Sequence, residues 1–352
     1  MKTPGTAQWR AAAESVSRLL PKGALHPAVV AWAEGRPPSE KWAVALSGGA
    51  DSAGLLMLLW AHWPRRRARL SAYHFNHRLR GRSSDADERF CRALCKALGV
   101  PLVTGRWRPS KERRGESHAR AARFAFLEPR LAKGRIRVLW LGHQQDDIAE
   151  TMLMRLSRGS GSAGLAAPRP IHALGPAKGA GKGMTHVRPL LTLKKAEIAS
   201  ALRAAKAPWR EDASNAKAVH FRNRIRSAVL PAWVEASQRD AVSGAALSRE
   251  LLEEDNHALE AWVDSLGLFA RDGSMDTGRL KGLPRAVVRR ALHRWLLSLG
   301  DTGDFSRQAF GVLLRSVEVG TPVRHSLGSH GFAVIRGGRL GYDLTRKPRS
   351  FH

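Results

Sequence analysis

The segment from residue 47 to residue 52 constrains the fold of this 352-residue chain more than any other feature. It lies between two apolar runs, residues 42–46 and 53–60, and that order predicts a strand, a tight loop and a helix. Glycine permits positive φ and close approach of the backbone to a ligand, and helix N-termini favour anions. The loop is therefore predicted to bind phosphate or pyrophosphate, although a ligand-free turn fits a lone Gly-Gly pair equally well. The six candidate residues are Ser47, Gly48, Gly49, Ala50, Asp51 and Ser52, of which Asp51 is also a candidate metal ligand.

Strand candidates alternate with helix candidates over the next hundred residues. The strand candidates are residues 69–75, 101–104 and 138–141, and helix candidates begin near Ser84, Glu116 and Gln145. This alternation predicts an α/β fold with a Rossmann-like parallel sheet and helices on both faces. Ligands of such sheets bind at the carboxyl ends of the strands. The loop at 47–52, His77 and His143 each follow a strand candidate, so we expect them at one edge of the sheet.

The length allows two or three domains, and the pattern changes near residue 231. Residues 1–40 are weakly patterned and are interpreted as a lead-in. Residues 41–231 carry the strand–helix alternation and are predicted to form a catalytic domain. Residues 232–352 contain long amphipathic stretches and are predicted to form a mainly helical domain. Glycine turns within residues 322–342 indicate a β-hairpin or two.

The net charge of the chain indicates what kind of partner it binds. Lysine and arginine number 59 against 30 acidic residues, which gives a formal net charge of +29. Phosphate neutralisation by basic side chains dominates nucleic-acid affinity, so this excess favours a nucleic-acid partner. A proteome of generally basic proteins is the alternative.

Cysteine content and hydropathy point to the compartment. Cys91 and Cys95 are four residues apart on a predicted helix, and two ligands do not make a zinc site, so core packing is the expected role. There is no apolar run of about 18 residues and no signal-peptide pattern, so we expect neither a membrane span nor secretion. The chain is expected to be cytoplasmic.

A second group of polar residues follows the strand candidate at 138–141. Asp147 and Glu150 are three residues apart on a predicted helix and share a face, and His143 precedes that face. Carboxylates beside a phosphate loop suit Mg²⁺, or a cationic amine whose proton they accept. Acidic residues also stabilise a helix N-terminus through its dipole, and Asp146 is expected to do only that.

Two basic groups leave their role open. Arg120 and Arg123 are three residues apart and could meet a phosphate or a carboxylate, or form a solvated basic face. The segment 209–215 with the arginine-rich segment 222–226 could grip single-stranded RNA through stacking and arginine contacts, or form a surface helical cap.

These strings together resemble one family, the tRNA(Ile)-lysidine synthases of the ATP-pyrophosphatase, or PP-loop, superfamily. The resemblance implies the adenine nucleotide α-hydrolase type of sheet and cleavage of ATP between the α and β phosphates. It covers roughly residues 40–235 strongly, and the matching strings occur in the expected order. They lie at residues 47–52, 76–80, 116–124, 142–151, 155–161, 188–191, 209–215 and 222–226.

The resemblance implies a reaction on tRNA. ATP would adenylate the C2 carbonyl oxygen of the wobble cytidine in the CAU anticodon of tRNA(Ile), and the ε-amine of free L-lysine would displace AMP to give lysidine. The product pairs with A instead of G, which changes the codon read from AUG to AUA. Residues 232–352 would bind the tRNA substrate.

The resemblance also implies residue roles. The 47–52 loop and His77 would bind ATP, and Asp51 would hold Mg²⁺. Asp147 and Glu150 would hold the lysine ammonium, one of them accepting its proton. His143 and Arg123 would position phosphate or cytidine.

Departures and rival functions remain. Phe124 stands where the family usually has tyrosine, which removes a hydroxyl but keeps the ring. No extra C-terminal domain of the kind carried by longer members is evident, and the oligomeric state, a homodimer included, stays open.

A tRNA thiolase is one rival, but it would need catalytic or cluster-binding cysteines. A basic tRNA-binding module with an inactive nucleotide loop is the other.

Overall fold

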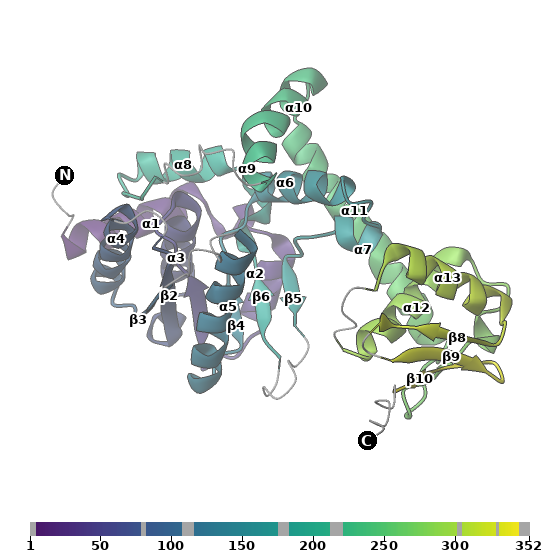
Figure 1. The fold of residues 1–352 in the computed structure, drawn as a ribbon. Coiled ribbons are helices and arrows are strands. Elements are labelled where there is room, and N and C mark those ends of the chain that lie inside the picture. Colours follow the sequence, from purple (N-terminus) through teal and green to yellow (C-terminus); the bar gives the residue numbers. More distant parts are fainter. Residues whose placement is uncertain are drawn as a thin grey trace. The chain divides into compact units, whose positions relative to one another are not determined.

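The computed structural model describes residues 5–78, 82–107, 116–174, 183–211, 221–300, 305–328 and 331–344 (Figure 1). The chain divides into two compact units, Met1–Leu252 and Glu253–His352. The boundary expected at 231/232 lies before this division, within the helical part of the first unit. The assignment of residues 232–352 as one functional domain therefore stays a prediction.

The first unit is built on a six-stranded sheet in the order β3-β2-β1-β4-β6-β5. All neighbours pair in parallel except β5 and β6, which are antiparallel. The predicted Rossmann-like parallel sheet is confirmed. Its strands are β1 (Trp42–Ala45), β2 (Leu70–Asn76), β3 (Leu102–Arg106), β4 (Val138–Trp140), β5 (Ile171–Ala173) and β6 (Thr185–Val187).

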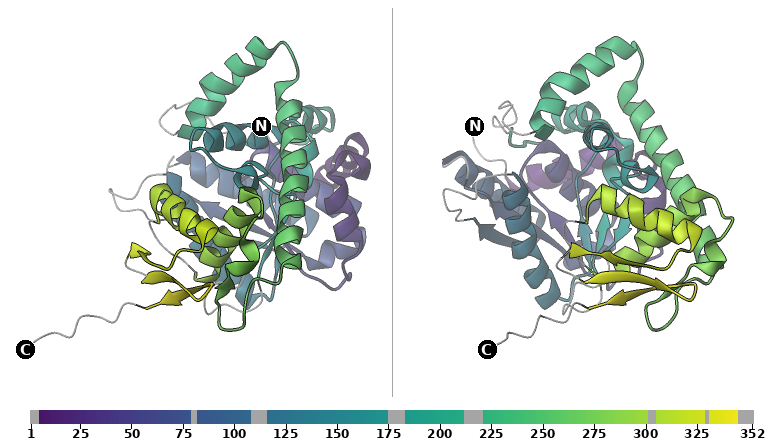
Figure 2. Two further views of the ribbon diagram at one scale, coloured as in Figure 1. Left: turned by 90° about the vertical axis from the view of Figure 1, so that its right-hand side faces the viewer. Right: turned by 45° about the vertical axis from the view of Figure 1, so that its right-hand side comes forward.

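Helices cover both faces of this sheet (Figures 1 and 2). Successive strand residues point to opposite faces, and β1 shows the consequence: Trp42 and Val44 join one apolar core, whereas Ala43 joins another. The larger core is formed with α1, α2, α3, α4 and α8, and the smaller one with α5. These helices are α1 (Thr6–Leu19), α2 (Pro27–Glu34), α3 (Ala50–His62), α4 (Arg82–Leu98), α5 (Glu116–Lys133) and α8 (Lys195–Ala204).

Residues 5–40 contribute α1 and α2 to the larger core, where Trp9 is 1% exposed. One prediction differs from the structure. The sequence predicts a helix that opens at Phe221 and runs to Leu230, before Pro231, but the helix continues from α9 (Phe221–Arg224) through a π-helical turn, Ile225–Val229, into α10 (Leu230–Ser237). Leu230 donates its N–H to the carbonyl of Ile225, and this wider turn lets the helix pass a proline that lacks a donor.

Three more helices lie wholly or partly in the first unit: α6 (Gln145–Leu156), α7 (Ser162–Leu165) and α11 (Ala241–Ser265). The first part of α11 belongs to the first unit, where Ala245 packs with Ala149, Met152 and Leu230 in a separate apolar cluster.

The second unit combines helices with a four-stranded sheet in the order β7-β10-β9-β8, whose pairs are antiparallel. Its core surrounds Trp295, which is fully buried. The predicted amphipathic helices and the glycine-turned hairpins are both present. The elements are α12 (Arg285–Ser298), α13 (Arg307–Val319), β7 (Met275–Asp276), β8 (Val323–Ser326), β9 (Phe332–Arg336) and β10 (Arg339–Asp343).

Gly142 allows the end of β4 to lie directly against the start of α3. A β-carbon at this position would lie 3.0 Å from the carbonyl oxygen of Asp51 and 3.2 Å from the backbone nitrogen of Ser52. The obstructing atoms are backbone and cannot swing aside. This close approach joins the two strand ends, β1 and β4, between which the strand order reverses and ligands bind in sheets of this type.

The substitution Gly142→Ala is expected to lower the free energy of unfolding by about 1–3 kcal/mol, because the added methyl group must push α3 away. Urea unfolding measures this change. The matched control is Gly244→Ala in α11, where a β-carbon would meet no atom within 4 Å and alanine favours the helix. Equal stability of the wild-type protein and Gly142→Ala would contradict the close approach.

Candidate active site

The loop at residues 47–52 leaves β1 and starts α3. Gly48 has φ +97°, which only glycine adopts readily, and Gly49 is the N-cap residue of α3. The Ser52 hydroxyl accepts hydrogen bonds from the N–H groups of Ser47 and Gly48, at 3.1 Å and 3.2 Å. Ser52 therefore shapes the loop from within. The N–H groups of the first helical turn have no acceptor inside the helix, so they are the donors available to an anion.

Arg210 fastens this loop from a distant part of the chain. Its backbone N–H donates to the carbonyl of Gly48 at 2.9 Å, and its Nε donates to Oδ1 of buried Asp87 on α4 at 2.9 Å. The sequence placed Arg210 in a segment that could grip RNA or form a surface helical cap, and Asp87 in the first turn of the helix that begins near Ser84. The hydrogen bond from Arg210 holds the carbonyl of Gly48, the residue whose positive φ gives the loop its shape. Arg210 is therefore a positioning residue for the loop.

Asp51 has the electrostatic signature of a cation ligand. Its Oδ1 is buried and has no hydrogen-bond partner among the residues that the structure describes. Burial, together with the nearby negative charge of Asp147, raises the pKa of Asp51 to about 7. No group of three histidine, cysteine, aspartate or glutamate side chains suited to a metal occurs in the described ranges. Mg²⁺ needs only one or two carboxylates when waters and phosphate oxygens complete its shell, so Asp51 fits that ion.

Asp147 and Glu150 lie on α6, as predicted, and two arginines bind them. Arg222 donates from Nη2 to Oδ1 of Asp147 at 2.6 Å and from Nε to Oε2 of Glu150 at 2.7 Å. Arg226 donates from Nε and Nη2 to the two oxygens of Glu150, at 2.5 Å and 3.0 Å. Glu150 is 0% exposed and Asp147 is 7% exposed. We call these four residues the ion-pair cluster.

The sequence explains how the arginines reach the carboxylates. Arg222 and Arg226 are four residues apart, so both project from one face of the helical stretch formed by α9 and the π-helical turn. Burial opposes the charge of Arg222, but Asp147 and Glu150 outweigh it and raise the pKa of the guanidinium further. The arginine-rich segment was predicted to grip RNA or cap a surface helix. Two of its arginines instead complete the candidate active site.

The turn between β4 and α6 places His143 beside a cation. Arg188 donates from Nε to Nδ1 of His143 at 3.0 Å and from Nη1 to the carbonyl of Arg169 at 2.7 Å. An imidazole nitrogen that accepts a hydrogen bond carries no proton, which fixes the neutral form of the ring at that nitrogen. Asp146 accepts from the backbone N–H of Lys195 at 3.0 Å, so it caps the neighbouring helix α8 and takes no part in the ion-pair cluster.

The remaining predicted residues lie around the smaller core. His77 packs edge-on against Phe75 and Trp107, with ring centroids 4.9 Å and 6.1 Å away. The guanidinium of Arg123 lies 5.6 Å from the ring of Phe124, which stacks on His186 at 5.8 Å. The side chains of Glu116 and Arg120, and residues Leu79, Arg80, Asp212, Ser214 and Asn215, lie outside the described residues. The roles of His77, Arg123 and His143 stay predictions.

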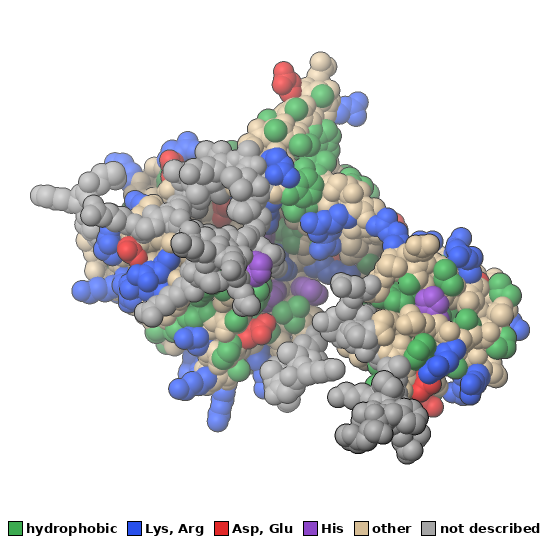
Figure 3. Space-filling model, viewed as in Figure 1, with side chains coloured by type: hydrophobic (Ala, Val, Ile, Leu, Met, Phe, Trp, Pro, Cys, Tyr) green, Lys and Arg blue, Asp and Glu red, His purple; other side chains and the backbone are tan. Residues whose placement is uncertain are grey.

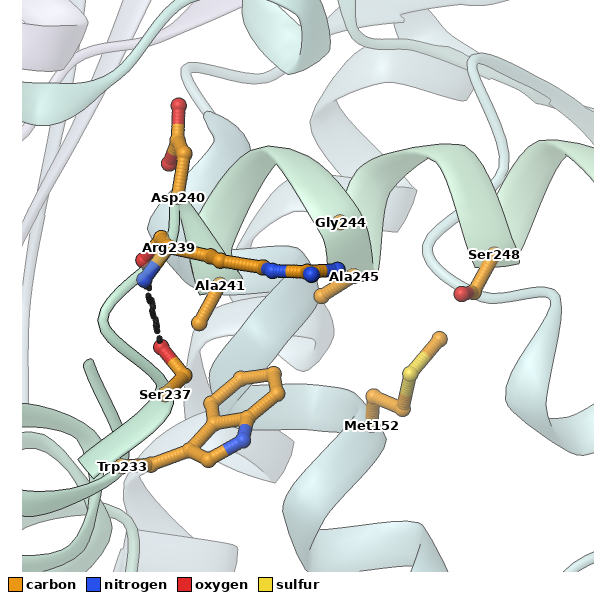
Figure 4. A pocket seen from close by; sticks show the side chains of 9 residues that line it. All are labelled: Met152, Trp233, Ser237, Arg239, Asp240, Ala241, Gly244, Ala245 and Ser248. Atoms are coloured by element: carbon orange, nitrogen blue, oxygen red, sulfur yellow. Dashed lines mark hydrogen bonds between the residues drawn. The ribbon is translucent and has the colours of Figure 1, made fainter.

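A cavity of about 310 Å³ opens elsewhere in the first unit (Figure 4). It lies between α6, α10 and α11, and it contains none of the predicted site residues. Its lining residues are Met152, Trp233, Ser237, Arg239, Asp240, Ala241, Gly244, Ala245 and Ser248. The chemistry therefore centres on the sheet edge, where Asp51 and the ion-pair cluster lie, and not on this cavity.

The two cysteines are structural. Cys91 and Cys95 are buried in the larger core, as predicted, and burial raises the pKa of both thiols, that of Cys95 to about 12. Such thiols are neither nucleophiles nor cluster ligands. In the part of the chain that the structure describes, no helix is long and apolar enough to cross a membrane. Lysine and arginine side chains are spread over the visible face of each unit (Figure 3).

Comparisons with known proteins agree with this geometry. The PP-loop domain family matches residues 27–233. The chain is 37% identical over 318 residues to the tRNA(Ile)-lysidine synthase of Solibacter usitatus, covering 88% of this chain and 69% of that protein. Its similarity to the enzyme of the same name from Symbiobacterium thermophilum is 37% identity over 336 residues, covering 89% of this chain and 66% of that protein. The chain is 35% identical over 302 residues to the tRNA(Ile)-lysidine synthase of Gloeobacter violaceus, and the match covers 83% of this chain and 88% of that protein.

The chain spans about two thirds of the length of the first two relatives and most of the third. The PP-loop match covers more than half of the chain and includes the 47–52 loop, Asp147, Glu150 and both arginines of the ion-pair cluster. On these grounds the chain belongs to the tRNA(Ile)-lysidine synthase family of ATP-using PP-loop enzymes.

Proposed function

We propose that this protein ligates L-lysine to the wobble cytidine of tRNA(Ile) bearing a CAU anticodon, in the cytoplasm, with ATP and Mg²⁺. ATP adenylates the C2 oxygen of the cytidine and pyrophosphate leaves. The ε-amine of lysine then attacks C2, loses a proton, and displaces AMP. The observation that carries this proposal is the juxtaposition, at one sheet edge, of the loop that starts α3, an Asp51 oxygen without a partner among the described residues, and the buried carboxylates of Asp147 and Glu150.

Each part of the site has a matching task. The first-turn N–H groups of α3 bind the phosphates, and preorganised donors of this kind stabilise charge that develops on a leaving group. Asp51 would hold Mg²⁺, which when bound would neutralise phosphate charge. Asp147 and Glu150 bind the lysine through an ammonium group. Residues 232–352 and the net charge of +29 provide the surface for tRNA.

The two rivals are weaker. A thiolase would need reactive cysteines, and both cysteines are buried with raised pKa values. A binding module with an inactive loop would not need buried carboxylates held beside that loop at the cost of their desolvation. The direct test is incubation with ATP, Mg²⁺, labelled lysine and tRNA(Ile) bearing CAU, followed by measurement of label in the tRNA. Absence of label would overturn the proposal.

The substitution Asp147→Ala is expected to raise the lysine concentration needed for half-maximal labelling by about 10–100-fold, the effect of losing one hydrogen bond to a charged group. The control is the adjacent Asp146→Ala, since that carboxylate caps α8 and does not face the arginines. Its lysine requirement should stay within about twofold of wild type. An unchanged lysine requirement in Asp147→Ala would remove this residue from the lysine site.

The substitution Arg210→Ala is expected to raise the KM for ATP by about tenfold with a smaller change in kcat, because the loop loses its anchor to Asp87. Pyrophosphate release at saturating tRNA and lysine measures both constants. Arg203→Ala on the exposed face of α8 is the control and should leave the KM unchanged. An unaltered KM in Arg210→Ala would show that Gly48 keeps its conformation without the hydrogen bond from Arg210 to Asp87.

The raised pKa of Asp51 predicts a pH-dependent stability. Since the folded protein holds the proton between the ordinary pKa of 3.8 and about 7, the free energy of unfolding of the ligand-free protein falls as pH rises through that interval. The Asp51→Asn variant has no proton to lose at this position, so its free energy of unfolding does not fall in this way. Its thermal midpoint should therefore exceed that of wild type by a few degrees at about pH 8, and the difference should shrink as pH falls and vanish only below about pH 4.

Added Mg²⁺ should narrow the difference at about pH 8, because the ionised carboxylate of the wild-type protein gains a partner. Parallel pH profiles of the two proteins would contradict the assignment of the raised pKa to Asp51.

A further inference from the structure

Glu88 on α4 carries a buried carboxylate outside the ion-pair cluster, with 3% of the residue exposed. Arg106, the last residue of β3, donates to it from Nε at 3.0 Å, and Arg92 donates from Nη2 at 2.8 Å. Burial opposes the charge of Glu88, but hydrogen bonds from Arg106, Arg92 and Asn76 outweigh it and lower the pKa of the carboxyl to about 2. Glu88 therefore stays ionised at neutral pH.

The third partner of this carboxylate is Asn76, the last residue of β2, which is 2% exposed. Its Nδ2 lies 3.3 Å from Oε2 of Glu88, 3.1 Å from Oδ1 of Asp85 and 3.3 Å from the carbonyl oxygen of Ser84. An ionised carboxylate accepts hydrogen bonds and donates none, so it selects the orientation in which the amide nitrogen faces it. The amide oxygen of Asn76 then accepts the backbone N–H of Arg78 at 2.9 Å.

This last hydrogen bond sets the backbone that follows β2. Arg78 has φ +52°, a left-handed conformation that is strained for a residue with a side chain. An asparagine side chain that binds the N–H two residues on forms an Asx-turn, which stabilises such a bend. His77, which is predicted to bind ATP, lies between the two residues, so its position depends on the same hydrogen bond. We call residues 76–78 the β2 turn.

The β2 turn lies beside the 47–52 loop. β2 and β1 pair in parallel, so their carboxyl ends meet at one edge of the sheet. His74 of β2 also reaches the entry of the loop, since its Nδ1 lies 2.9 Å from the carbonyl oxygen of Leu46. β1 separates β2 from β4, and the carboxylates of the ion-pair cluster belong to α6, which follows β4. The loop is therefore flanked by the β2 turn on one side and by the cluster on the other.

We propose that Glu88 is a positioning residue for the nucleotide, which acts through Asn76 to fix the β2 turn as one wall of the ATP site. This inference rests on the proposed function and adds to it a residue with no predicted role. The preceding residue, Asp87, binds Arg210 and so holds the 47–52 loop. Two adjacent carboxylates of α4 thus support two sides of one nucleotide site through the residues that they bind.

The test exchanges the two partners. Asn76→Asp puts a second carboxylate beside Glu88, and like charges repel, so the KM for ATP is expected to rise by about 10–100-fold. Adding Glu88→Gln restores a donor and an acceptor in the reverse direction, because a glutamine amide donates to a carboxylate that still accepts from Arg78. The double variant Asn76→Asp/Glu88→Gln is therefore expected to return the KM for ATP to within about threefold of wild type.

Pyrophosphate release at varied ATP, with saturating tRNA and lysine, gives the KM for ATP and kcat. The lysine requirement of the same preparations should stay within about twofold of wild type, because the ion-pair cluster lies on the other side of the loop. A merely structural role would impair the use of ATP and lysine together, and that result would overturn the inference. A double variant no better than Asn76→Asp would overturn it as well.

The matched control is Arg89→Ala. Arg89 follows Glu88 on α4 and is exposed, so this variant should keep the wild-type KM for ATP. A KM as high as that of Asn76→Asp would overturn the assignment to Glu88.

A second pair of variants decides if Asn76→Asp does not fold. Glycine adopts positive φ without help, so Arg78→Gly should lessen the rise in the KM for ATP that Glu88→Gln causes alone. No recovery in Arg78→Gly/Glu88→Gln would overturn the inference. Failure of wild type to release pyrophosphate with cognate tRNA would overturn the proposed function, whereas an unchanged KM for ATP in the variants of an active enzyme overturns this inference alone.

Discussion

The removal of carboxylates from water at the carboxyl edge of the sheet is the constraint on which this structure depends. Asp147 and Glu150 are almost fully buried, and an uncompensated carboxylate in such a position would be strongly unfavourable. The chain meets that requirement with Arg222 and Arg226, which approach from a helix more than seventy residues further along. Among the described residues no donor reaches Oδ1 of Asp51, so burial raises the pKa of this carboxyl and the position attracts a cation.

This constraint also explains why the helix after residue 220 must be placed so accurately. The same stretch carries the arginines on one side and, in α10, contributes Leu230 to the apolar cluster with Ala149 and Met152 on α6. Charge pairing and apolar packing thus hold α6 from two directions. Arg210 donates to Gly48 and to Asp87 and so positions the neighbouring 47–52 loop. Residues between α8 and α10 therefore support both the loop and the ion-pair cluster.

Sequence reasoning found the sheet, the loop and the pair Asp147 and Glu150 because each leaves a local signal. Alternation of strands and helices, a glycine pair after an apolar run, and carboxylates three residues apart are all visible within a short window. The partners of those residues leave none. Arg222 lies 72 residues from Glu150, and Arg210 lies 123 residues from Asp87. Which arginine in so basic a chain pairs inward is decided by tertiary packing, which no local pattern encodes. The helix predicted to end before Pro231 continues for a local reason: in the π-helical turn Leu230 donates to the carbonyl of Ile225, and the wider turn accommodates a proline without an N–H.

The π-helical turn at Ile225–Val229 has a geometric effect beyond accommodating Pro231. A π turn holds one residue more than an α-helical turn, and one residue corresponds to a rotation of about 100° about the helix axis. The side chains before the turn and those after it therefore follow two different angular registers within one continuous helix. The face that presents Arg222 to the carboxylates is set independently of the face on which Leu230 and Trp233 pack. One inserted residue lets a single helix serve a polar site and an apolar interface that a uniform α-helix of the same sequence would set against each other.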